Sequence, residues 1–310
     1  MRLKKPHVSV LVPSYNRHEL LVDTLKGLLI QKYKPNEIIV YDQSTNHPHD
    51  VEAFLKQCSS QTIHIKGHPK GLVDAYRRCV ELSHGDICLF VDDDVLISDP
   101  NMVKKHVDNY KDSRIGAVSG QVLHEGQVDA RPIDPRVRGP NGWMFVRFDT
   151  DTRIEDLPSL FGPNMSFRKS VYERIGGFDL AYSGSGFRFE TDFTFAVKAA
   201  GYKVIFDPTA SIVHRYQQPG GAENRHLFSL KDDSHFWYIN FFANTWYFLK
   251  KWYSIPVASK LMVPIWREHV INRNTLGAGS KFLIKRHHVF LKGIFLGQQR
   301  AINRSSKQHG

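Results

Sequence analysis

An apolar run from Ile87 to Val91 ends in three consecutive carboxylates, Asp92, Asp93 and Asp94. Carboxylates this close together repel one another, and a divalent cation would keep them ionised. Side chains alternate along a strand, so Asp92 and Asp94 should face one side and Asp93 the other. The pattern predicts a divalent-cation site at the end of a buried strand. An acidic turn that caps the next helix is the alternative interpretation.

A second pair of acids, Glu190 and Asp192, precedes a segment in which Phe193, Val197 and Ala200 share one helical face. A carboxylate can accept the proton of an attacking hydroxyl, so this pair offers a candidate general base. Acids also stabilise the positive end of a helix, and that structural role is the alternative interpretation.

Buried strands and amphipathic helices alternate along the first third of the chain. We expect strands at 8–12, 62–65 and 87–91 and one ending at Asp42, with helices at 19–31, 51–58 and 72–83. This alternation is typical of a doubly wound α/β sheet. Ligands of such sheets bind beyond the carboxyl ends of the strands, so residues 13–17, 42–44 and 92–94 should meet in one crevice.

Five motifs of the chain resemble, in order and spacing, those of the family 2 glycosyltransferases. They are VSVLVPSYNR, IIVYDQS, GDICLFVDDDV, GPNMSFRKSVYERIGGFD and ETDFTFAVKAAGYKVIFDP, and the resemblance covers about residues 7 to 215. It implies a GT-A fold, which is a Rossmann-like mixed α/β sheet flanked by helices. It also implies a nucleotide-diphosphate sugar donor, a divalent cation (Mn²⁺ or Mg²⁺) and inversion at the anomeric carbon.

The resemblance also implies roles for individual residues. Glu190 falls on the position of the general base, with Asp192 as the alternative base or as a residue that orients a neighbour. Asp94 and His214 fall on positions of metal ligands. The implied nucleotide-sugar-binding residues are Pro13, Tyr15, Arg17, Asp42, Asp92, Asp93 and Asn164.

Three positions depart from the family pattern. Arg17 stands where an acid is frequent, and Tyr76-Arg77 stands where Arg-Asn is common. Glu190 replaces an aspartate, which keeps the carboxylate but lengthens its arm by one methylene. The remaining histidines, which lack metal-ligand spacing, are expected to be surface or core residues: His47, His49, His64, His68 and the pair His287-His288.

Charge divides the chain into two regions. From Asn240 to the end there are twelve Lys and Arg residues and one acid, Glu268, whereas the rest of the chain is balanced. We expect a catalytic domain at 1–235, with a nucleotide-binding part at about 1–120 and an acceptor side at about 121–235. Residues 236–310 should form a basic, aromatic-rich helical extension.

Three apolar and basic stretches of this extension are too short to span a bilayer. Basic residues interleave with the aromatic residues of this extension, which predicts attachment to an anionic membrane surface. The side chains expected to enter it are Trp237, Phe241, Trp246, Phe248, Trp252 and Trp266. A helical subdomain with these aromatic residues in its core is the alternative.

The sequence therefore predicts an inverting, metal-dependent glycosyltransferase with a glycan or lipid-linked acceptor, acting in cell-surface polysaccharide or glycolipid synthesis. Three cysteines without a pairing pattern and an N-terminus unlike a secretion signal indicate the cytoplasm, at the inner face of the cell membrane.

Two other function classes share single features with this chain. A nucleotidyltransferase also holds a metal on acids at a strand end, but VPSYNR lacks the glycines of a triphosphate-binding loop. A nucleic-acid-binding protein would explain the basic tail, but no helix-turn-helix, zinc or RNA-binding signature is present, so we expect no nucleic-acid partner.

Overall fold

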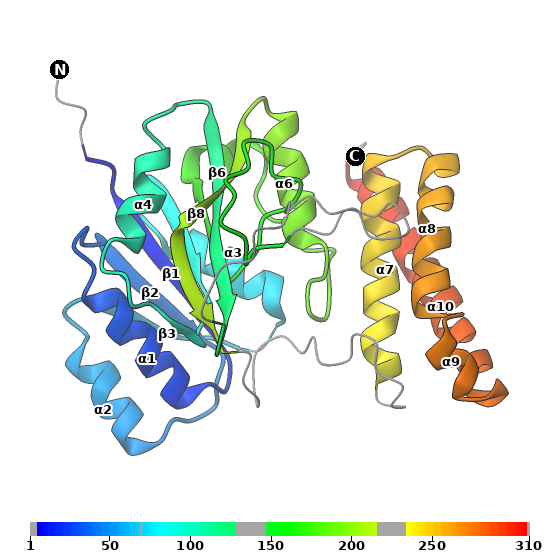
Figure 1. Ribbon diagram of the computed structural model, residues 1–310, viewed down its shortest axis with the longest axis horizontal. Coiled ribbons are helices and arrows are strands. Elements are labelled where there is room, and N and C mark those ends of the chain that lie inside the picture. Colours follow the sequence, from blue (N-terminus) through cyan, green and yellow to red (C-terminus); the bar gives the residue numbers. More distant parts are fainter. Residues whose placement is uncertain (1–4, 69, 128–146, 216–233, 309–310) are drawn as a thin grey trace. The chain divides into compact units, whose positions relative to one another are not determined.

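The computed structural model describes residues 5–68, 70–127, 147–215 and 234–308, which form two compact units (Figure 1). The N-terminal unit contains the described residues up to 178 and those from 190 to 215. The C-terminal unit contains residues 179–189 and the described residues from 234 onward. Part of the expected 121–235 acceptor side, at 128–146 and 216–233, lies outside the described residues.

One eight-stranded sheet of order β3-β2-β1-β4-β7-β6-β8-β5 organises the N-terminal unit. The strands are β1 (Val8–Ser14), β2 (Glu37–Asp42), β3 (Thr62–Lys66), β4 (Ile87–Val91), β5 (Val95–Leu96), β6 (Ile115–His124), β7 (Asn164–Arg168) and β8 (Lys203–His214). Strands β1 to β4 pair in parallel, whereas β7 is antiparallel to both of its neighbours. The sheet is therefore mixed, as the expected fold class requires.

Helices cover both faces of this sheet. They are α1 (His18–Leu29), α2 (His49–Gln57), α3 (Leu72–Leu82), α4 (Met102–Asn109), α5 (Lys169–Arg174) and α6 (Phe189–Ala199). Val8, Val10 and Val12 of β1 alternate onto the face that packs against α1, α2 and α4. On the opposite face, the ring of Tyr76 from α3 stacks on Phe90 of β4 with a centroid distance of 4.3 Å.

Two features of the sheet position the site. Ser14, at the end of β1, pairs with Asp42 at the end of β2, and β4 stops immediately before Asp92, so three loops leave the same edge. The short strand β5 begins directly after Asp94 and pairs antiparallel with β8, with Val95 opposite His214. This pairing brings His214 next to the acidic loop, although about 120 residues separate them in the sequence.

The C-terminal unit is helical. Its helices are α7 (Ser234–Trp252), α8 (Ile255–His269), α9 (Arg273–Gly277) and α10 (Ser280–Gln308). Gly293 and Gly297 of α10 face the backbone of α7, and a Cβ atom added at Gly297 would lie 2.5 Å from the Ala243 carbonyl oxygen. These glycines, four residues apart, allow the two helix backbones to approach closely. Among the described helices, none has the combination of length and apolar character that crossing a bilayer requires.

Most aromatic residues of α7 lie in the core of this unit, although Phe236 is exposed. Trp237, Phe241 and Phe248 are at most 7% exposed, and the rings of Trp237 and Phe241 stack with centroids 5.2 Å apart. The prediction that these side chains enter a membrane is therefore wrong. Burial of large rings among other rings removes more apolar surface from water than a partly wetted interface would, which favours the core.

A carboxylate and histidine site at the strand ends

Asp92, Asp94 and His214 come together at the carboxyl end of β4. His214 Nε2 lies 3.3 Å from Asp92 Oδ2 and 3.3 Å from Asp94 Oδ1. Asp94 is almost fully buried, whereas the side chain of Asp92 is about one quarter exposed. Asp92 and Asp94 thus face one side of the strand, as the alternation predicted. Together with His214 they present two carboxylates and one imidazole to a common point.

Asp93 faces the other way, into the protein. Its Oδ2 accepts hydrogen bonds from the Ser14 hydroxyl at 2.7 Å and from the Tyr15 backbone N–H at 3.2 Å. Burial raises the pKa of Asp93 to about 6, although Arg17 and Ser14 oppose this shift. Asp93 therefore holds the end of β1 and the loop that follows it against the loop after β4, and its role in donor binding stays a prediction.

Arg17 is buried between the acids. Its Nη1 forms an ion pair with Asp94 Oδ2, and its Nε lies 3.9 Å from Asp93 Oδ1. The guanidinium thereby neutralises part of the negative charge that three adjacent carboxylates accumulate. An arginine at a position where the family frequently has an acid is thus explained by charge: it faces Asp94 from the side opposite His214.

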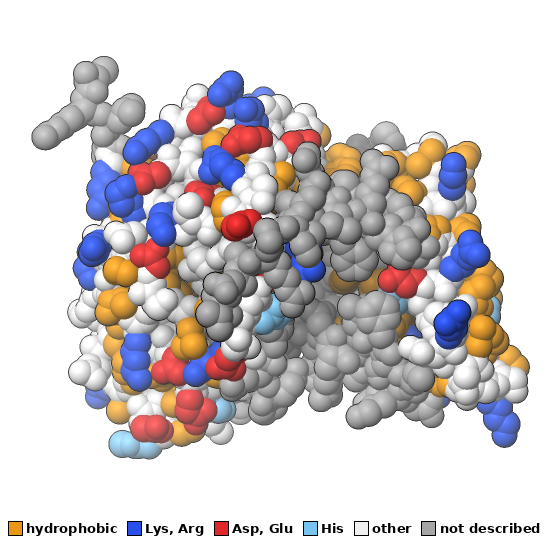
Figure 2. All heavy atoms as spheres, viewed as in Figure 1, with side chains coloured by type: hydrophobic (Ala, Val, Ile, Leu, Met, Phe, Trp, Pro, Cys, Tyr) orange, Lys and Arg blue, Asp and Glu red, His pale blue; other side chains and the backbone are white. Residues whose placement is uncertain are grey.

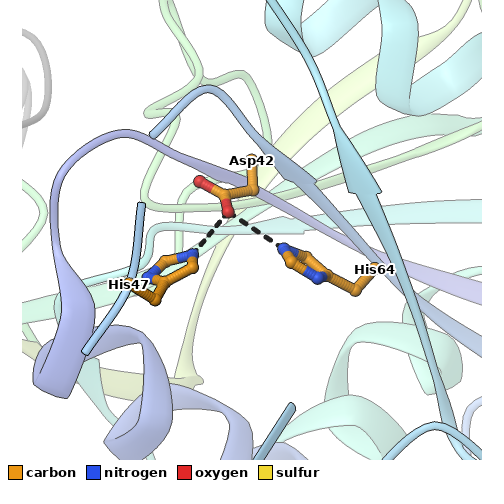
Figure 3. Close-up of side chains that lie close together, drawn as sticks. All are labelled: Asp42, His47 and His64. Carbon is orange, nitrogen blue, oxygen red and sulfur yellow. Dashed lines mark hydrogen bonds and ion pairs between the residues drawn. The ribbon is translucent and has the colours of Figure 1, made fainter. Parts of the chain in front are cut away.

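Asp42, at the end of β2, is fully buried within a cluster of basic side chains (Figure 3). Its Oδ2 lies 2.5 Å from His47 Nε2, 2.9 Å from His64 Nε2 and 2.9 Å from Lys66 Nζ. Burial would raise the pKa of Asp42, but hydrogen bonds from His64, Ser44 and Lys66 outweigh it and lower the pKa well below its usual range. His47 and His64, expected to be ordinary surface or core residues, instead contact a predicted donor-binding carboxylate.

Tyr76 connects the acidic loop with the start of α6. Its hydroxyl donates to Asp92 Oδ1 at 3.1 Å. A Cβ atom added at Gly162 would lie 2.7 Å from the Tyr76 hydroxyl oxygen and 3.3 Å from Glu190 Oε1, so Tyr76 and Glu190 flank the same glycine. Burial and the charges of Asp92 and Glu190 raise the pKa of Tyr76 well above its usual value. The tyrosine is therefore a neutral donor between the two acids.

Glu190 and Asp192 differ in environment. Glu190 is partly exposed in the first turn of α6, whereas Asp192 is 3% exposed. Two residues along a helix correspond to a rotation of about 200°, so the two carboxylates point to different sides. Only Glu190 combines solvent access with proximity to Tyr76.

Asn164, one of the predicted donor-binding residues, is hydrogen-bonded inside the sheet, and its role in donor binding stays a prediction. Its Nδ2 donates to the carbonyl oxygens of Gln121 at 3.0 Å and Ala210 at 2.8 Å. Its Oδ1 lies 2.8 Å from His106 Nε2, and the side chain is fully buried. Because every polar atom of this amide is paired inside the sheet, Asn164 ties β7 to its neighbours.

The remaining predicted donor-binding residues lie near the end of β1 and in the loop after it. Pro13 is buried at its register position opposite Tyr41, whereas Tyr15 is 41% exposed beside the acidic loop. Asn16 adopts a positive φ of 55°, which asparagine tolerates, and its N–H donates to Ser44 Oγ at 2.8 Å. The three loops that were expected to converge therefore contact one another.

The residues at His214 fit a divalent cation. The candidate ligand atoms of Asp92, Asp94 and His214 all lie within 4.8 Å of one another. Carboxylate oxygens suit Mg²⁺ and Mn²⁺, and one imidazole is compatible with Mn²⁺. Arg17 contacts Asp94 Oδ2, which leaves Oδ1 on the side of His214.

The fold is that of the GT-A class. A mannosyltransferase of Pyrobaculum calidifontis, solved with GDP-Man and Mn²⁺, superposes with a TM-score of 0.56 at 18% identity, covering 96% of this chain and 87% of that one. At 18% identity, this structural similarity is evidence for the fold alone.

The family profile described as "Glycosyl transferase family 2" matches residues 9–176, so the chain belongs to this family. It is 23% identical to a glucosyl-dolichyl phosphate glucuronosyltransferase of Haloferax volcanii, over 67% of this chain and 69% of that one. It is 25% identical to an O-antigen chain rhamnosyltransferase of Salmonella typhimurium, over 71% and 70%. The chain is a glycosyltransferase, and the nucleotidyltransferase and nucleic-acid-binding alternatives are set aside.

Sequence reasoning missed two groups of residues at the site. Tyr76 was recognised only as a departure from the family pattern, and His47 and His64 were set aside because their spacing from Asp42 matches no metal motif. One signal was present for His64: on paired strands, side chains near the ends of β2 and β3 come together whatever their separation in sequence.

Proposed function

We propose that this glycosyltransferase moves a sugar, with inversion, from a nucleotide-diphosphate donor to a hydroxyl of a glycan or lipid-linked acceptor. The observation that carries this proposal is the arrangement of Asp92, Asp94 and His214 within one group, with Tyr76 joining Asp92 to the vicinity of Glu190. A diphosphate-binding group and a base on either side of one crevice are what a single displacement requires.

In this mechanism Asp92, Asp94 and His214 hold a divalent cation, Mn²⁺ or Mg²⁺, which when bound neutralises charge on the leaving diphosphate. Arg17 keeps Asp94 oriented through its ion pair. Pro13 and Asp42, near the ends of β1 and β2, and Tyr15, in the loop after β1, would contact the base and ribose of the donor.

Glu190 is the proposed general base. As the acceptor oxygen forms its bond to the anomeric carbon, the bond from that carbon to the diphosphate oxygen breaks, and the electron pair leaves with the diphosphate. The hydroxyl proton passes to the Glu190 carboxylate. The exposed position of Glu190 gives an acceptor access to it, whereas buried Asp192 would act by stabilising the start of α6.

The acceptor class is inferred from relatives and from the C-terminal unit. Two relatives are a glucosyl-dolichyl phosphate glucuronosyltransferase and an O-antigen chain rhamnosyltransferase. Their names refer to lipid-linked or cell-surface glycans. These names support a role in polysaccharide or glycolipid synthesis. The inner face of the cell membrane is the location that we propose for it.

The outer face of α10 supports attachment to such a membrane. Four large apolar residues, Ile284, Leu291, Phe295 and Ile302, are each at least 55% exposed. Their spacings of seven, four and seven residues align them along one side of the helix. We call this row the α10 stripe. Figure 2 shows hydrophobic and basic side chains next to one another on the C-terminal unit.

Charge favours anionic lipid as the partner of the α10 stripe. Lys281, Lys285 and Lys292 are exposed and follow the stripe at helical spacing, and Glu268 is the only acid from Asn240 onward. Each lysine near an anionic surface contributes on the order of 1 kcal/mol, in addition to the insertion of apolar side chains.

The transfer proposal is tested with a panel of nucleotide sugars, each with and without Mn²⁺. We expect one donor to stabilise the protein against thermal unfolding and to be hydrolysed slowly, and both effects to require the ion. Asp94→Asn should lose both. Hydrolysis by the wild-type protein in excess chelator, or full activity of Asp94→Asn, would contradict the assignment of the cation to this group.

A further inference from the structure

We propose that Asp42, His47 and His64 form a second metal site, selective for zinc-like ions and separate from the group at Asp92, Asp94 and His214. Two imidazoles and one carboxylate are a common ligand set of zinc, with water in the fourth position. This site lies at the β2 and β3 end of the sheet and shares Asp42 with the proposed donor contacts, so its test measures zinc binding and not sugar transfer.

The three side chains already converge. Asp42 Oδ2 lies 2.5 Å from His47 Nε2 and 2.9 Å from His64 Nε2, and the ligand atoms all lie within 4.8 Å of one another. In Figure 3 both imidazole rings direct this nitrogen toward the same carboxylate oxygen. A zinc ion bound at about 2.0–2.2 Å from each atom would replace the two Nε2 protons, and tetrahedral geometry would move the ligand atoms apart to about 3.3–3.6 Å.

The groups behind these ligands resemble the outer support of a metal site. His47 Nδ1 lies 2.8 Å from His18 Nδ1, so the far side of the imidazole is fixed by a hydrogen bond. Asp42 Oδ1 accepts a hydrogen bond from the Ser44 backbone N–H at 2.8 Å, which orients Oδ2 toward the histidines. Such partners fix the orientation of ligands, and their removal typically weakens metal binding about 10- to 100-fold.

The three ligands also differ in how firmly packing holds their side chains. The side chains of Asp42 and His47 are fully buried, whereas that of His64, on the edge strand β3, is 23% exposed. Two ligands are therefore pre-positioned by packing, and the third is accessible to an ion arriving from solvent.

Lys66 competes with a cation at this position. Its Nζ lies 2.9 Å from Asp42 Oδ2, the same oxygen that the histidines face. The side chain is 47% exposed, so the ammonium can turn into solvent when an ion binds. Removal of this positive charge should therefore strengthen zinc binding, a result that a purely structural hydrogen-bond network does not produce.

The ligand chemistry separates the two sites. Imidazole nitrogens, of which the Asp42 site has two, favour Zn²⁺ over Mg²⁺ and Mn²⁺. The group at Asp92, Asp94 and His214 has two carboxylates and one imidazole. Asp94→Asn therefore provides a background in which the other group is impaired and the histidine site is intact.

The experiment measures zinc binding to the full chain carrying Asp94→Asn, by competition with a chromophoric chelator. We expect one zinc ion per chain. Adding His64→Gln should weaken binding at least about tenfold, while His49→Gln, at an exposed histidine outside the group, should leave it unchanged. Lys66→Gln should tighten binding several-fold.

Thermal unfolding shows whether a variant fails to bind zinc only because it no longer folds. Without zinc, the His64→Gln and His49→Gln proteins should unfold at similar temperatures, and zinc should raise the midpoint of the parent and of His49→Gln but not of His64→Gln. No zinc binding by the parent, equal binding by the two histidine variants, or weaker binding by Lys66→Gln would each overturn the site and leave a hydrogen-bonded cluster around Asp42.

Discussion

At the scale of single residues, few side chains connect the proposed metal ligands with the proposed general base. Tyr76 is the described residue whose hydroxyl contacts Asp92 and whose ring lies beside the glycine that also faces Glu190. The metal group and the proposed base come from β4, β8 and α6, so their separation is set by packing and not by the chain between them.

Glu190→Gln should reduce sugar transfer by about a hundredfold or more, because the amide cannot accept the acceptor proton. Donor affinity should remain nearly unchanged, since the proposed donor contacts lie on other loops. Steady-state kinetics and donor titration measure the two effects. Asp192→Asn is the control, and an inactive Asp192→Asn beside an active Glu190→Gln would require the roles to be exchanged.

Tyr76→Phe should lower the rate of transfer about tenfold at saturating donor, because Asp92 loses the hydrogen bond that orients it. Tyr110→Phe is the matched control: its buried hydroxyl lies 2.7 Å from Ser166 Oγ, on β7. Both changes remove one buried hydroxyl and should cost about 1 kcal/mol of unfolding free energy. Equal activities of the two variants would remove Tyr76 from the mechanism.

At the scale of elements, buried polar contacts fix the fit between helices and sheet. His106 of α4 lies 2.9 Å from Ser166 Oγ and 2.8 Å from Asn164 Oδ1, both on β7. Because the Asn164 amide nitrogen donates to two carbonyls, its oxygen must accept from His106 Nε2–H. Burial lowers the pKa of this imidazole and so favours its neutral form.

Burial of this histidine makes stability depend on pH. It lowers the pKa of His106 from 6.5 to about 4. The unfolded chain binds a proton as pH falls below about 6.5 while the folded protein does not until about 4, so the free energy of unfolding should fall by about 3 kcal/mol across this window. Denaturant unfolding at pH 7 and pH 4 measures it. His106→Gln should show a shallower loss, and equal slopes would contradict this account.

The contact between α7 and α10 depends on glycine. Gly297→Ala places a methyl group against the Ala243 carbonyl oxygen and should destabilise the C-terminal unit by about 1–3 kcal/mol, despite the better helix propensity of alanine. Gly277→Ala in α9 meets open space and should be neutral or stabilising by up to about 1 kcal/mol. Thermal unfolding followed by circular dichroism distinguishes the pair, and equal shifts would show that the helices tolerate separation.

At the scale of the whole molecule, basic residues and exposed apolar side chains are unevenly distributed along the chain. Not all twelve basic residues after Asn240 are available to a partner: Lys251 pairs with Asp179 at 2.8 Å, and the Arg286 guanidinium is buried 3.7 Å from the Tyr238 ring centroid. The lysines beside the α10 stripe remain exposed.

The full chain should co-sediment with vesicles that contain anionic lipid, and high salt should weaken this binding. Leu291→Glu should reduce binding about tenfold or more, because insertion of one leucine contributes about 1.5–3 kcal/mol and the new charge is repelled. Ile30→Glu, at an exposed apolar residue of the N-terminal unit, is the control. Equal binding of the two variants, or none by the wild type at low salt, would remove the membrane from the proposal.

The sequence by itself determined the fold class, the family and the loops that carry the acids. Strand and helix periodicity depends on local residue order, and the D-x-D pair follows a strand whose apolar run is unmistakable, so both could be predicted without coordinates. The outward row of α10 is likewise present in the spacing of its apolar residues.

Only the tertiary structure decided which of these side chains face one another. Asn164 and Asp93 occupy family positions of the site, yet their hydrogen bonds are made inside the protein, and most aromatic residues of α7 fill a core. His47, His64 and Tyr76 reach the acids from other elements. The reason is that strand pairing and helix packing bring distant residues together, and whether a polar or apolar group is satisfied by protein or by water depends on those neighbours.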